Sequence, residues 1–262
     1  MKKYIQRIYG GIAIQDTGPE FNFNIDNISS DVIYLQKDVS GTFNEDGVEY
    51  VYAYEYNPNS SQADRKLVRT FLKNVTEDDE DIYEFVENGV FMLDKYHRLE
   101  EFGAIVTTYS TNRPSLTEVM HDYFAQYCTH NFISFKLLKK AYKDVQFDQA
   151  KAKDALIAEG RTEIEANREV KRAAKKFEKL KETDELFEMK KFLPRAIRSS
   201  FSNFLKFRSE EEKEIYLSLQ GVNVLIYDDF LTSGATVKEI IRYLKSFNEN
   251  NTLTVFVLVK QH

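Results

Sequence analysis

Residues 222–247 constrain the fold most strongly, because a strand, two carboxylates, a short loop and an amphipathic helix follow one another directly. The apolar, β-favouring run 222–227 is typical of a strand buried in a parallel sheet. The apolar residues of the following helix share one face: Val237, Ile240, Ile241, Leu244 and Phe247. The pattern predicts an α/β fold with helices packed on a parallel sheet.

The polar residues of this segment fall at the two places where such a sheet binds ligands. Asp228 and Asp229 follow the apolar run, and the sequence TSGAT at 232–236 precedes the helix. Unpaired N–H groups at a helix N-terminus favour a phosphate, and two carboxylates suit sugar hydroxyls or a magnesium ion. The segment predicts a sugar-phosphate site. The alternative is an ordinary turn whose acids merely begin the loop.

Residues 224–236 resemble the motif with which type I phosphoribosyltransferases bind 5-phosphoribosyl 1-diphosphate (PRPP). That motif has four apolar residues, two acidic residues, two apolar residues and a hydroxyl-rich loop that contains glycine and ends in Thr or Ser. Here these parts are VLIY, DD, FL and TSGAT. Tyr227 and Phe230 are bulkier than the residues that the family usually carries there.

The resemblance implies a Rossmann-like parallel sheet flanked by helices and an enzyme that uses Mg²⁺. The implied reaction is displacement of pyrophosphate from carbon 1 of PRPP by a nitrogenous acceptor. Asp228 and Asp229 would act as the catalytic pair, hold the ribose 2′- and 3′-hydroxyls and contact the metal only indirectly. The residues carried over to the 5′-phosphate are Thr232, Ser233, Gly234, Ala235 and Thr236.

Two positions of the loop allow finer expectations. Family members that act on 6-oxopurines carry an acidic general base where this chain has Thr232, so salvage of hypoxanthine or guanine is disfavoured. The acceptor itself is not identified by the sequence. Thr236 and Glu239 have the spacing of a capping box, so we expect Thr236 to divide its hydroxyl between helix cap and ligand.

Residues 102–127 form a second unit of strand, polar loop and helix. Ser115 and Glu118 have capping-box spacing and predict the start of the helix. In the family that the chain resembles, the corresponding loop holds pyrophosphate. The candidates by position are Thr111, Asn112 and Arg113, and the guanidinium group of Arg113 suits a diphosphate. A purely structural loop is the alternative.

The pattern along the chain predicts three parts: a β-rich N-terminal hood over 1–100, an α/β core over 101–262, and a helical insertion over 146–193 within that core. The insertion is rich in charge, with Gly160 and a Thr162–Glu165 capping box that favour a helical hairpin or one long helix. It would form a solvated helix or an arm for a partner, such as a homodimer contact.

The hood contains a period-two run in which Tyr50, Tyr52, Tyr54 and Tyr56 alternate with other residues. We expect a half-buried strand face that pairs with a strand over 31–36 in a hairpin or meander, because aromatic residues favour strands. A platform for stacking bases is the alternative.

Residues 194–208 combine basic and aromatic side chains. Arg195, Arg198 and Phe201 loosely match the stretch before the PRPP strand in the competence-protein branch of the family. A surface helix with its aromatic residues inward is the alternative. Two further functions therefore remain open: a non-catalytic sensor of PRPP or a nucleotide, and a competence-type protein that handles DNA.

Composition limits the classes of partner, compartment and metal site that are expected for this chain. The formal net charge of −6 argues against general nucleic-acid binding. The single cysteine, Cys128, fits a reducing compartment, so we expect a cytoplasmic protein. No apolar stretch approaches the roughly 18–20 residues that a membrane span needs. The four histidines lack the spacing of a zinc site: His97, His121, His130 and His262.

Overall fold

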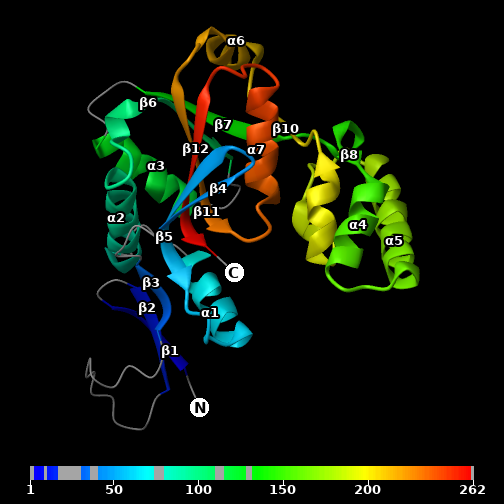
Figure 1. Ribbon diagram of the computed structural model, residues 1–262, viewed down its shortest axis with the longest axis horizontal. Coiled ribbons are helices and arrows are strands. Elements are labelled where there is room, and N and C mark those ends of the chain that lie inside the picture. The colour runs from blue at the N-terminus through cyan, green and yellow to red at the C-terminus, as the bar shows by residue number, and fades with distance from the viewer. Residues whose placement is uncertain are drawn as a thin grey trace.

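A computed structural model describes residues 3–8, 11–16, 31–35, 41–73, 80–109, 115–127 and 132–260, with side chains described from residue 41 onward. One mixed sheet runs through the molecule in the order β1-β2-β3-β5-β12-β11-β6-β7-β10, and β4 also pairs with β5 (Figure 1). The strands are β1 (Lys3–Ile8), β2 (Gly11–Asp16), β3 (Asp31–Leu35), β4 (Thr42–Glu45), β5 (Val48–Tyr56), β6 (Phe102–Thr108), β7 (Ile133–Lys139), β10 (Leu205–Lys206), β11 (Asn223–Leu231) and β12 (Thr252–Lys260).

The centre of the sheet is parallel and its two sides are antiparallel. Strands β5, β12, β11, β6 and β7 run in the same direction. Antiparallel strands continue the sheet beyond β5 and beyond β7. The predicted α/β class with helices flanking the sheet is confirmed, and the sheet is mixed and mostly parallel. Short turns join antiparallel neighbours, as Asp46 and Gly47 do between β4 and β5 with φ of 52° and 74°.

Helices cover both faces of the parallel centre. The apolar residues of α7 (Ala235–Lys245) pack in one core cluster. Those of α1 (Gln62–Lys73), α2 (Glu80–Asp94) and α3 (Leu116–Tyr127) pack in the other. Figure 1 shows α2 and α3 on the side of the sheet away from α7. This two-sided cover explains the nearly continuous apolar sequences of β11 and β12.

The described strands within residues 1–100, β1 to β5, all belong to the main sheet. Strand β5 is parallel to β12, and the expected pairing with the strand near residue 31 is present, with Ile33 opposite Tyr56. The expectation of a half-buried tyrosine face is wrong. Tyr50 and Tyr52 are buried in one core cluster, whereas Tyr54 and Tyr56 are buried in the other, because β5 lies inside the sheet.

The predicted helical hairpin corresponds to α4 (Gln149–Ala158) and α5 (Glu163–Lys181). Thr162 and Glu165 form the capping box at the start of α5, and Gly160 has the positive φ of 88° that the turn between the helices requires. We call residues 140–204, which contain this hairpin, the lobe; it lies beside α7 in Figure 1. A role of the hairpin in partner binding stays a prediction.

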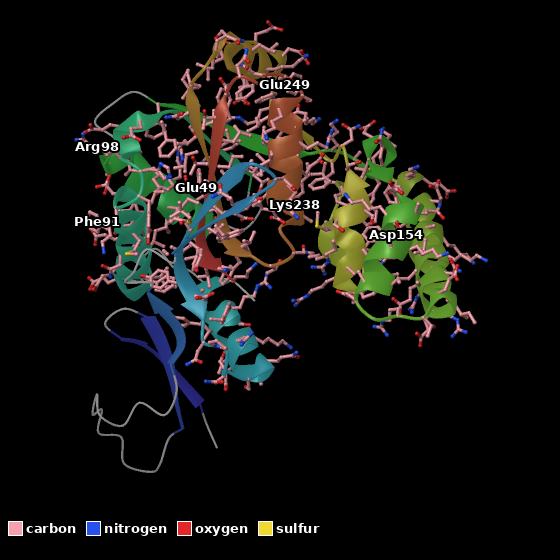
Figure 2. All side chains as sticks on the ribbon, viewed as in Figure 1. Glu49, Phe91, Arg98, Asp154, Lys238 and Glu249 are labelled. Carbon is pink, nitrogen blue, oxygen red and sulfur yellow. The ribbon has the colours of Figure 1, made fainter. Side chains whose placement is uncertain are left out.

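Aromatic rings hold the lobe together and join it to the main core. Phe177, Phe192 and Phe201 pack with centroids 4.4–6.1 Å apart. Phe187 and Phe204 extend the same cluster, with their ring centroids 5.1 Å apart. Charged side chains of the hairpin such as that of Asp154, labelled on α4 in Figure 2, are exposed. None of the helices in the described part of the chain has the length and apolar character needed to cross a bilayer.

The hairpin of β4 and β5 is tied to the first turns of α7. The Lys238 ammonium group lies 2.7 Å from the Glu45 carboxylate, near the lower end of α7 in Figure 2. Both side chains are partly exposed, so the pair contributes at most about 1 kcal/mol. The pair mainly orients the β4–β5 hairpin, because it holds the hairpin beside the end of α7 that borders the site described below.

Replacing Gly89 tests the close approach of α2 to the sheet. A Cβ at this position would lie 3.3 Å from the Ala53 Cβ and would collide with the Leu258 side chain. We expect Gly89→Val to lower the free energy of unfolding by about 1–3 kcal/mol through overpacking, measured by urea denaturation. Asn88→Ala on the same helix is the control. An unchanged urea midpoint in Gly89→Val would show that the helix can move away from the sheet without cost.

Candidate functional site

The candidate site lies where the connections of the parallel sheet diverge. The chain leaves β6 through α3 to reach β7, and it leaves β11 through α7 to reach β12. Because β6 and β11 are neighbours and their helices cover opposite faces, the sheet has a topological switch point between them. Open α/β sheets place their ligands at the carboxyl ends of the strands at such a point.

Strands β6 and β11 separate before β11 ends. Their pairing stops at Ile226 opposite Val106, whereas β11 stays paired with β12 as far as Leu231. The Thr107 hydroxyl donates a hydrogen bond of 2.9 Å to the Tyr227 carbonyl at the point of separation. The acidic pair therefore lies within β11 and not after it, because one side of the strand remains paired while the other opens into a crevice.

Asp228 and Asp229 occupy the floor of this crevice. The Asp229 N–H donates to Asp228 Oδ1 at 2.9 Å, and the Phe230 N–H donates to Asp229 Oδ1 at 2.8 Å. Burial, followed by the neighbouring Asp229 charge, raises the pKa of Asp228 well above its ordinary value. The site thus favours a proton, a cation or hydroxyl donors on Asp228 over a bare carboxylate.

The loop after β11, residues 232–236, borders the same space. Gly234 is the N-cap of α7 with φ 65°, and it provides no side-chain cap. Lys238 N–H bonds back to the Gly234 carbonyl at 2.8 Å. The preceding N–H groups of the first helical turn have no acceptor among the described residues. An uncapped helix N-terminus of this kind can accept an anion.

The expected capping box of Thr236 and Glu239 is wrong. Because Gly234 is the N-cap, Glu239 lies beyond the first turn and points into the core. There its carboxylate accepts the Phe204 N–H at 3.1 Å and pairs with Arg242 at 2.7 Å. Thr236 is therefore free of the capping role and lines the cavity.

These elements surround a cavity of about 450 Å³. Every residue predicted for the acidic pair and the phosphate loop lines it, namely Asp228, Asp229, Thr232, Ser233, Gly234, Ala235 and Thr236. Six basic residues line it as well, namely Arg69, Lys73, Lys139, Lys190, Arg198 and Lys206. Two carboxylates face six cationic side chains, so the cavity is suited to a polyanion.

The candidates for pyrophosphate, Thr111, Asn112 and Arg113, lie outside the described residues. The residues that lead into and follow their loop do reach the cavity. Thr108 and Tyr109 at the end of β6 line it, as does Thr117 in α3. The contribution of Arg113 stays a prediction.

The basic stretch 194–208 is divided by the structure. Arg198 and Lys206 line the cavity, whereas Arg195 is exposed outside its lining. The alternative of a surface helix is half right: the stretch forms a short 3₁₀ segment (Arg195–Ser200) and short strands, but its aromatic side chains do point inward. Phe201 and Phe204 are buried, which excludes them as a platform for stacking bases.

Four cationic residues of the cavity were not predicted. Arg69 and Lys73 come from α1, Lys139 from the end of β7, and Lys190 from the lobe. The i,i+4 spacing of Arg69 and Lys73 was the available signal, since like charges on one helix face are destabilising without a ligand. The other two are distant in sequence from the motif and meet it only through folding.

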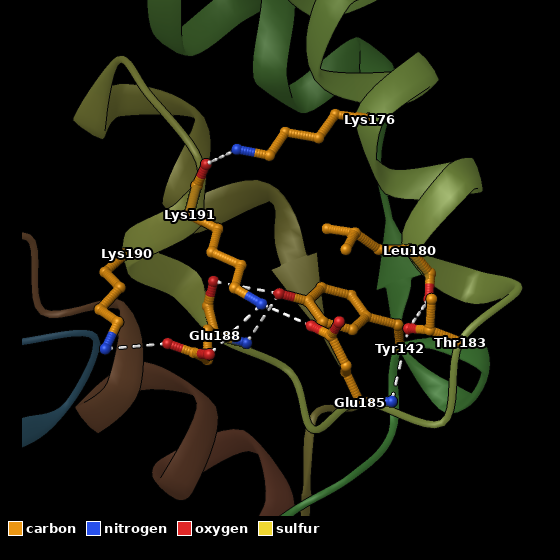
Figure 3. Close-up of polar contacts among 8 residues, drawn as sticks. All are labelled: Tyr142, Lys176, Leu180, Thr183, Glu185, Glu188, Lys190 and Lys191. Carbon is orange, nitrogen blue, oxygen red and sulfur yellow. Dashed lines mark hydrogen bonds and ion pairs between the residues drawn. The ribbon is translucent and has the colours of Figure 1, made fainter.

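A polar network fixes the lobe residues that border the cavity (Figure 3). The Glu188 N–H donates to the Tyr142 hydroxyl at 3.1 Å. The Glu188 carboxylate contacts the Lys190 ammonium group at 2.9 Å and Lys191 at 3.3 Å. These contacts hold the pKa of the Glu188 carboxyl below its ordinary value. Lys190 thus reaches the cavity with a carboxylate partner already in place.

No cluster of three or more potential metal ligands occurs among the residues that the structure describes. The acidic pair alone suits Mg²⁺, since this ion commonly uses one or two carboxylates together with water and ligand phosphates. Neither a protein-family model nor a curated protein sequence matches this chain. Any functional conclusion therefore depends on the geometry of the site and on its motif.

Asp228→Asn should stabilise the fold, although it removes a carboxylate from the candidate site. Because the pKa of Asp228 is raised on folding, the folded state holds a proton that the unfolded state loses above about pH 4. The contribution of Asp228 to the free energy of unfolding of the wild type is therefore largest below that pH. It falls as the pH rises through the pKa that Asp228 has in the folded state. We expect the Tm difference between variant and wild type to grow from pH 5 to pH 8. It should reach roughly 2–4 °C, the shift that about 1 kcal/mol produces in a domain of this size.

The measurement is thermal unfolding of both proteins across this pH range. Asp154→Asn on the lobe surface is the control and should show no pH-dependent difference from wild type. A constant difference between Asp228→Asn and wild type would contradict a raised pKa for Asp228.

Proposed function

We propose that the chain binds PRPP at this cavity and transfers its phosphoribosyl group to a nitrogenous acceptor. The observation that carries the proposal is the meeting of two groups at one switch point. The uncapped N-terminus of α7 and the carboxylates of Asp228 and Asp229 face the same cavity. A phosphorylated pentose has the complementary chemistry, with an anion at one end and vicinal hydroxyls in the ring.

The loop 232–236 at the N-terminus of α7 would hold the 5′-phosphate by backbone N–H groups and hydroxyls. Gly234 lets the loop turn with positive φ, and Ser233 and Thr236 add hydroxyl donors on either side of it. The acidic pair would accept hydrogen bonds from the ribose 2′- and 3′-hydroxyls. Hydroxyl donors suit this pair because carboxylate oxygens are hydrogen-bond acceptors.

The positive lining supports a diphosphate as the second anionic group. Lys139 at the end of β7 and Lys190 of the lobe both line the cavity. Burial lowers the pKa of the Lys139 ammonium group, and the charges of Glu188 and Asp228 partly offset that shift. A bound Mg²⁺ would neutralise diphosphate charge, and the acidic pair would reach it through water or the ribose hydroxyls.

The reaction breaks the bond between carbon 1 and the diphosphate oxygen and forms a bond between carbon 1 and the acceptor nitrogen. The diphosphate leaves with the bonding electron pair, and the acceptor loses a proton. Positive charge develops on the ribose ring as the bond breaks, so the nearby carboxylates stabilise the transition state. Most of the remaining catalysis would come from holding the two reactants in line.

Removal of the acidic pair tests the proposal. We expect Asp228→Asn/Asp229→Asn to weaken the binding of PRPP with Mg²⁺ at least tenfold, because amides replace two charged hydrogen-bond acceptors. Isothermal titration calorimetry measures the affinity, and circular dichroism verifies that the fold persists. Asp154→Asn/Asp184→Asn changes the net charge equally on the lobe surface and should bind as wild type does. Equal affinity in both double variants would refute the assignment.

Pyrophosphate release separates catalysis from sensing. We expect wild type to release pyrophosphate from PRPP when Mg²⁺ and a suitable acceptor are present, measured with a coupled assay over a panel of bases and amines. PRPP binding without release in any of these mixtures would favour the non-catalytic sensor instead. A failure to bind PRPP with or without Mg²⁺ would refute both functions.

A further inference from the structure

Two guanidinium groups in the cavity lack a counter-ion that the protein itself supplies. Arg69 and Arg198 come from α1 and from the 3₁₀ segment of the lobe, and both are partly buried. No carboxylate pairs with either one in the described ranges. Half-buried, unpaired positive charges are costly, so their presence in a cavity points to an anion that the ligand brings.

Arg69 lies on the side of the acidic pair that faces α1. Its guanidinium carbon lies 5.3 Å from the centre of the Phe230 ring, and the Lys73 ammonium group lies 5.8 Å from the same centre. The charges of Arg69 and Asp229 both act on the Tyr56 hydroxyl, whose pKa is raised to about 12 chiefly by burial. Arg69 is therefore held next to the residue that follows the acidic pair.

Arg198 approaches from the lobe. Its Nε donates to the Phe192 carbonyl at 3.2 Å, which fixes the side chain and leaves the terminal nitrogens available. Burial first, and then the charges of Arg195 and Arg69, lower the pKa of Arg198. Both guanidinium groups thus line the same cavity, one from α1 and the other from the lobe.

The other cavity cations are the ammonium groups of Lys73, Lys139, Lys190 and Lys206. Lys190 contacts Glu188 at 2.9 Å. Burial lowers the pKa of Lys139, and the charges of Glu188 and Asp228 partly offset this shift. The charge of Lys73 opposes the rise in the pKa of Asp228 that burial causes. The N-terminus of α7 would take the 5′-phosphate. These groups account for the two anionic ends of PRPP and leave Arg69 and Arg198 without an assigned ligand.

We propose that Arg69 and Arg198 bind a carboxylate on the nitrogenous acceptor, so that the substrate class is an anionic, carboxylate-bearing nitrogen heterocycle or aromatic amine. This inference rests on the proposed phosphoribosyl transfer. A guanidinium group presents a planar fork of donors that matches a carboxylate by two parallel hydrogen bonds. Two such groups would select an acid over its neutral amide or unsubstituted analogue.

Arg69 reaches the cavity from α1, whereas Arg198 reaches it from the lobe, which also carries Lys190. An acceptor nitrogen attacks carbon 1 from the face opposite the leaving diphosphate in an in-line displacement. A carboxylate held by Arg69 and Arg198 would orient the acceptor ring for that attack without taking part in bond making.

The experiment uses three matched pairs of acceptors: nicotinate and nicotinamide, orotate and uracil, and anthranilate and aniline. Binding is measured by thermal shift and calorimetry for the full chain, with and without Mg²⁺ and PRPP. Pyrophosphate release is measured in parallel. We expect at least one acid to bind tenfold or more tightly than its neutral partner. Arg69→Gln should abolish that preference, and Arg198→Lys should reduce it because lysine keeps the charge but lacks the fork.

Lys66→Gln provides the control, since it removes one exposed positive charge from α1 outside the cavity lining. It should keep the full preference for the acid. No preference for any acid in wild type, or a preference that survives in Arg69→Gln, would overturn the inference while leaving PRPP transfer intact. A fall in PRPP affinity as large as the fall in acid affinity would assign the arginines to the PRPP phosphates and would also overturn it.

Failure of the proposed function has a different signature. Wild type would then bind no PRPP and release no pyrophosphate. Because acid and neutral partners are also compared without PRPP, a preference that disappears in Arg69→Gln would still identify the two arginines as a carboxylate site. The acceptor role assigned to that site would be overturned in that case.

Discussion

The unequal pairing of β11 is the constraint on which the site depends. One edge of the strand is bonded to β12 through Leu231, and the other is bonded to β6 only as far as Ile226. Continued pairing on the first edge holds the acidic pair in a rigid strand. Loss of pairing on the second edge opens the crevice that exposes it. If both edges were paired, the carboxylates would be enclosed in the sheet, and if neither were paired, they would lie on a loop with no fixed direction.

Charge around this crevice is arranged at a cost to the folded protein. A carboxyl whose pKa is raised by burial lies on the floor, and partly buried arginines without carboxylate partners line the walls. Neither arrangement helps the empty protein to fold, because buried charge without a partner is unfavourable. Both become favourable when the cavity holds a ligand with hydroxyl groups and several negative charges. Local departures of this kind from optimal stability are typical of functional sites.

The lobe gives the cavity a wall that is part of the core. Its aromatic cluster is continuous with the core on the α7 face, and the Glu188 network holds the segment that carries Lys190. Arg198 is likewise anchored through the Phe192 carbonyl. The cationic groups on this side are therefore presented by packed structure, so they can be positioned before a ligand arrives. Such preorganisation reduces the ordering cost of binding.

The sequence by itself determined the local units of this protein, and tertiary structure decided what they face. Strand β11, its acidic pair, the glycine loop and α7 follow from short-range pattern and helix geometry, as do the hairpin of α4 and α5 and its capping box. The burial of β5 on both faces and the inward turn of Glu239 could not be predicted, because each depends on neighbours distant in the chain. The same holds for Arg69, Lys139 and Lys190, which line the cavity from three separate elements. Periodicity records which face of an element is apolar, whereas the partners of a charged side chain are set only when the sheet order and the packing of the lobe bring distant segments together.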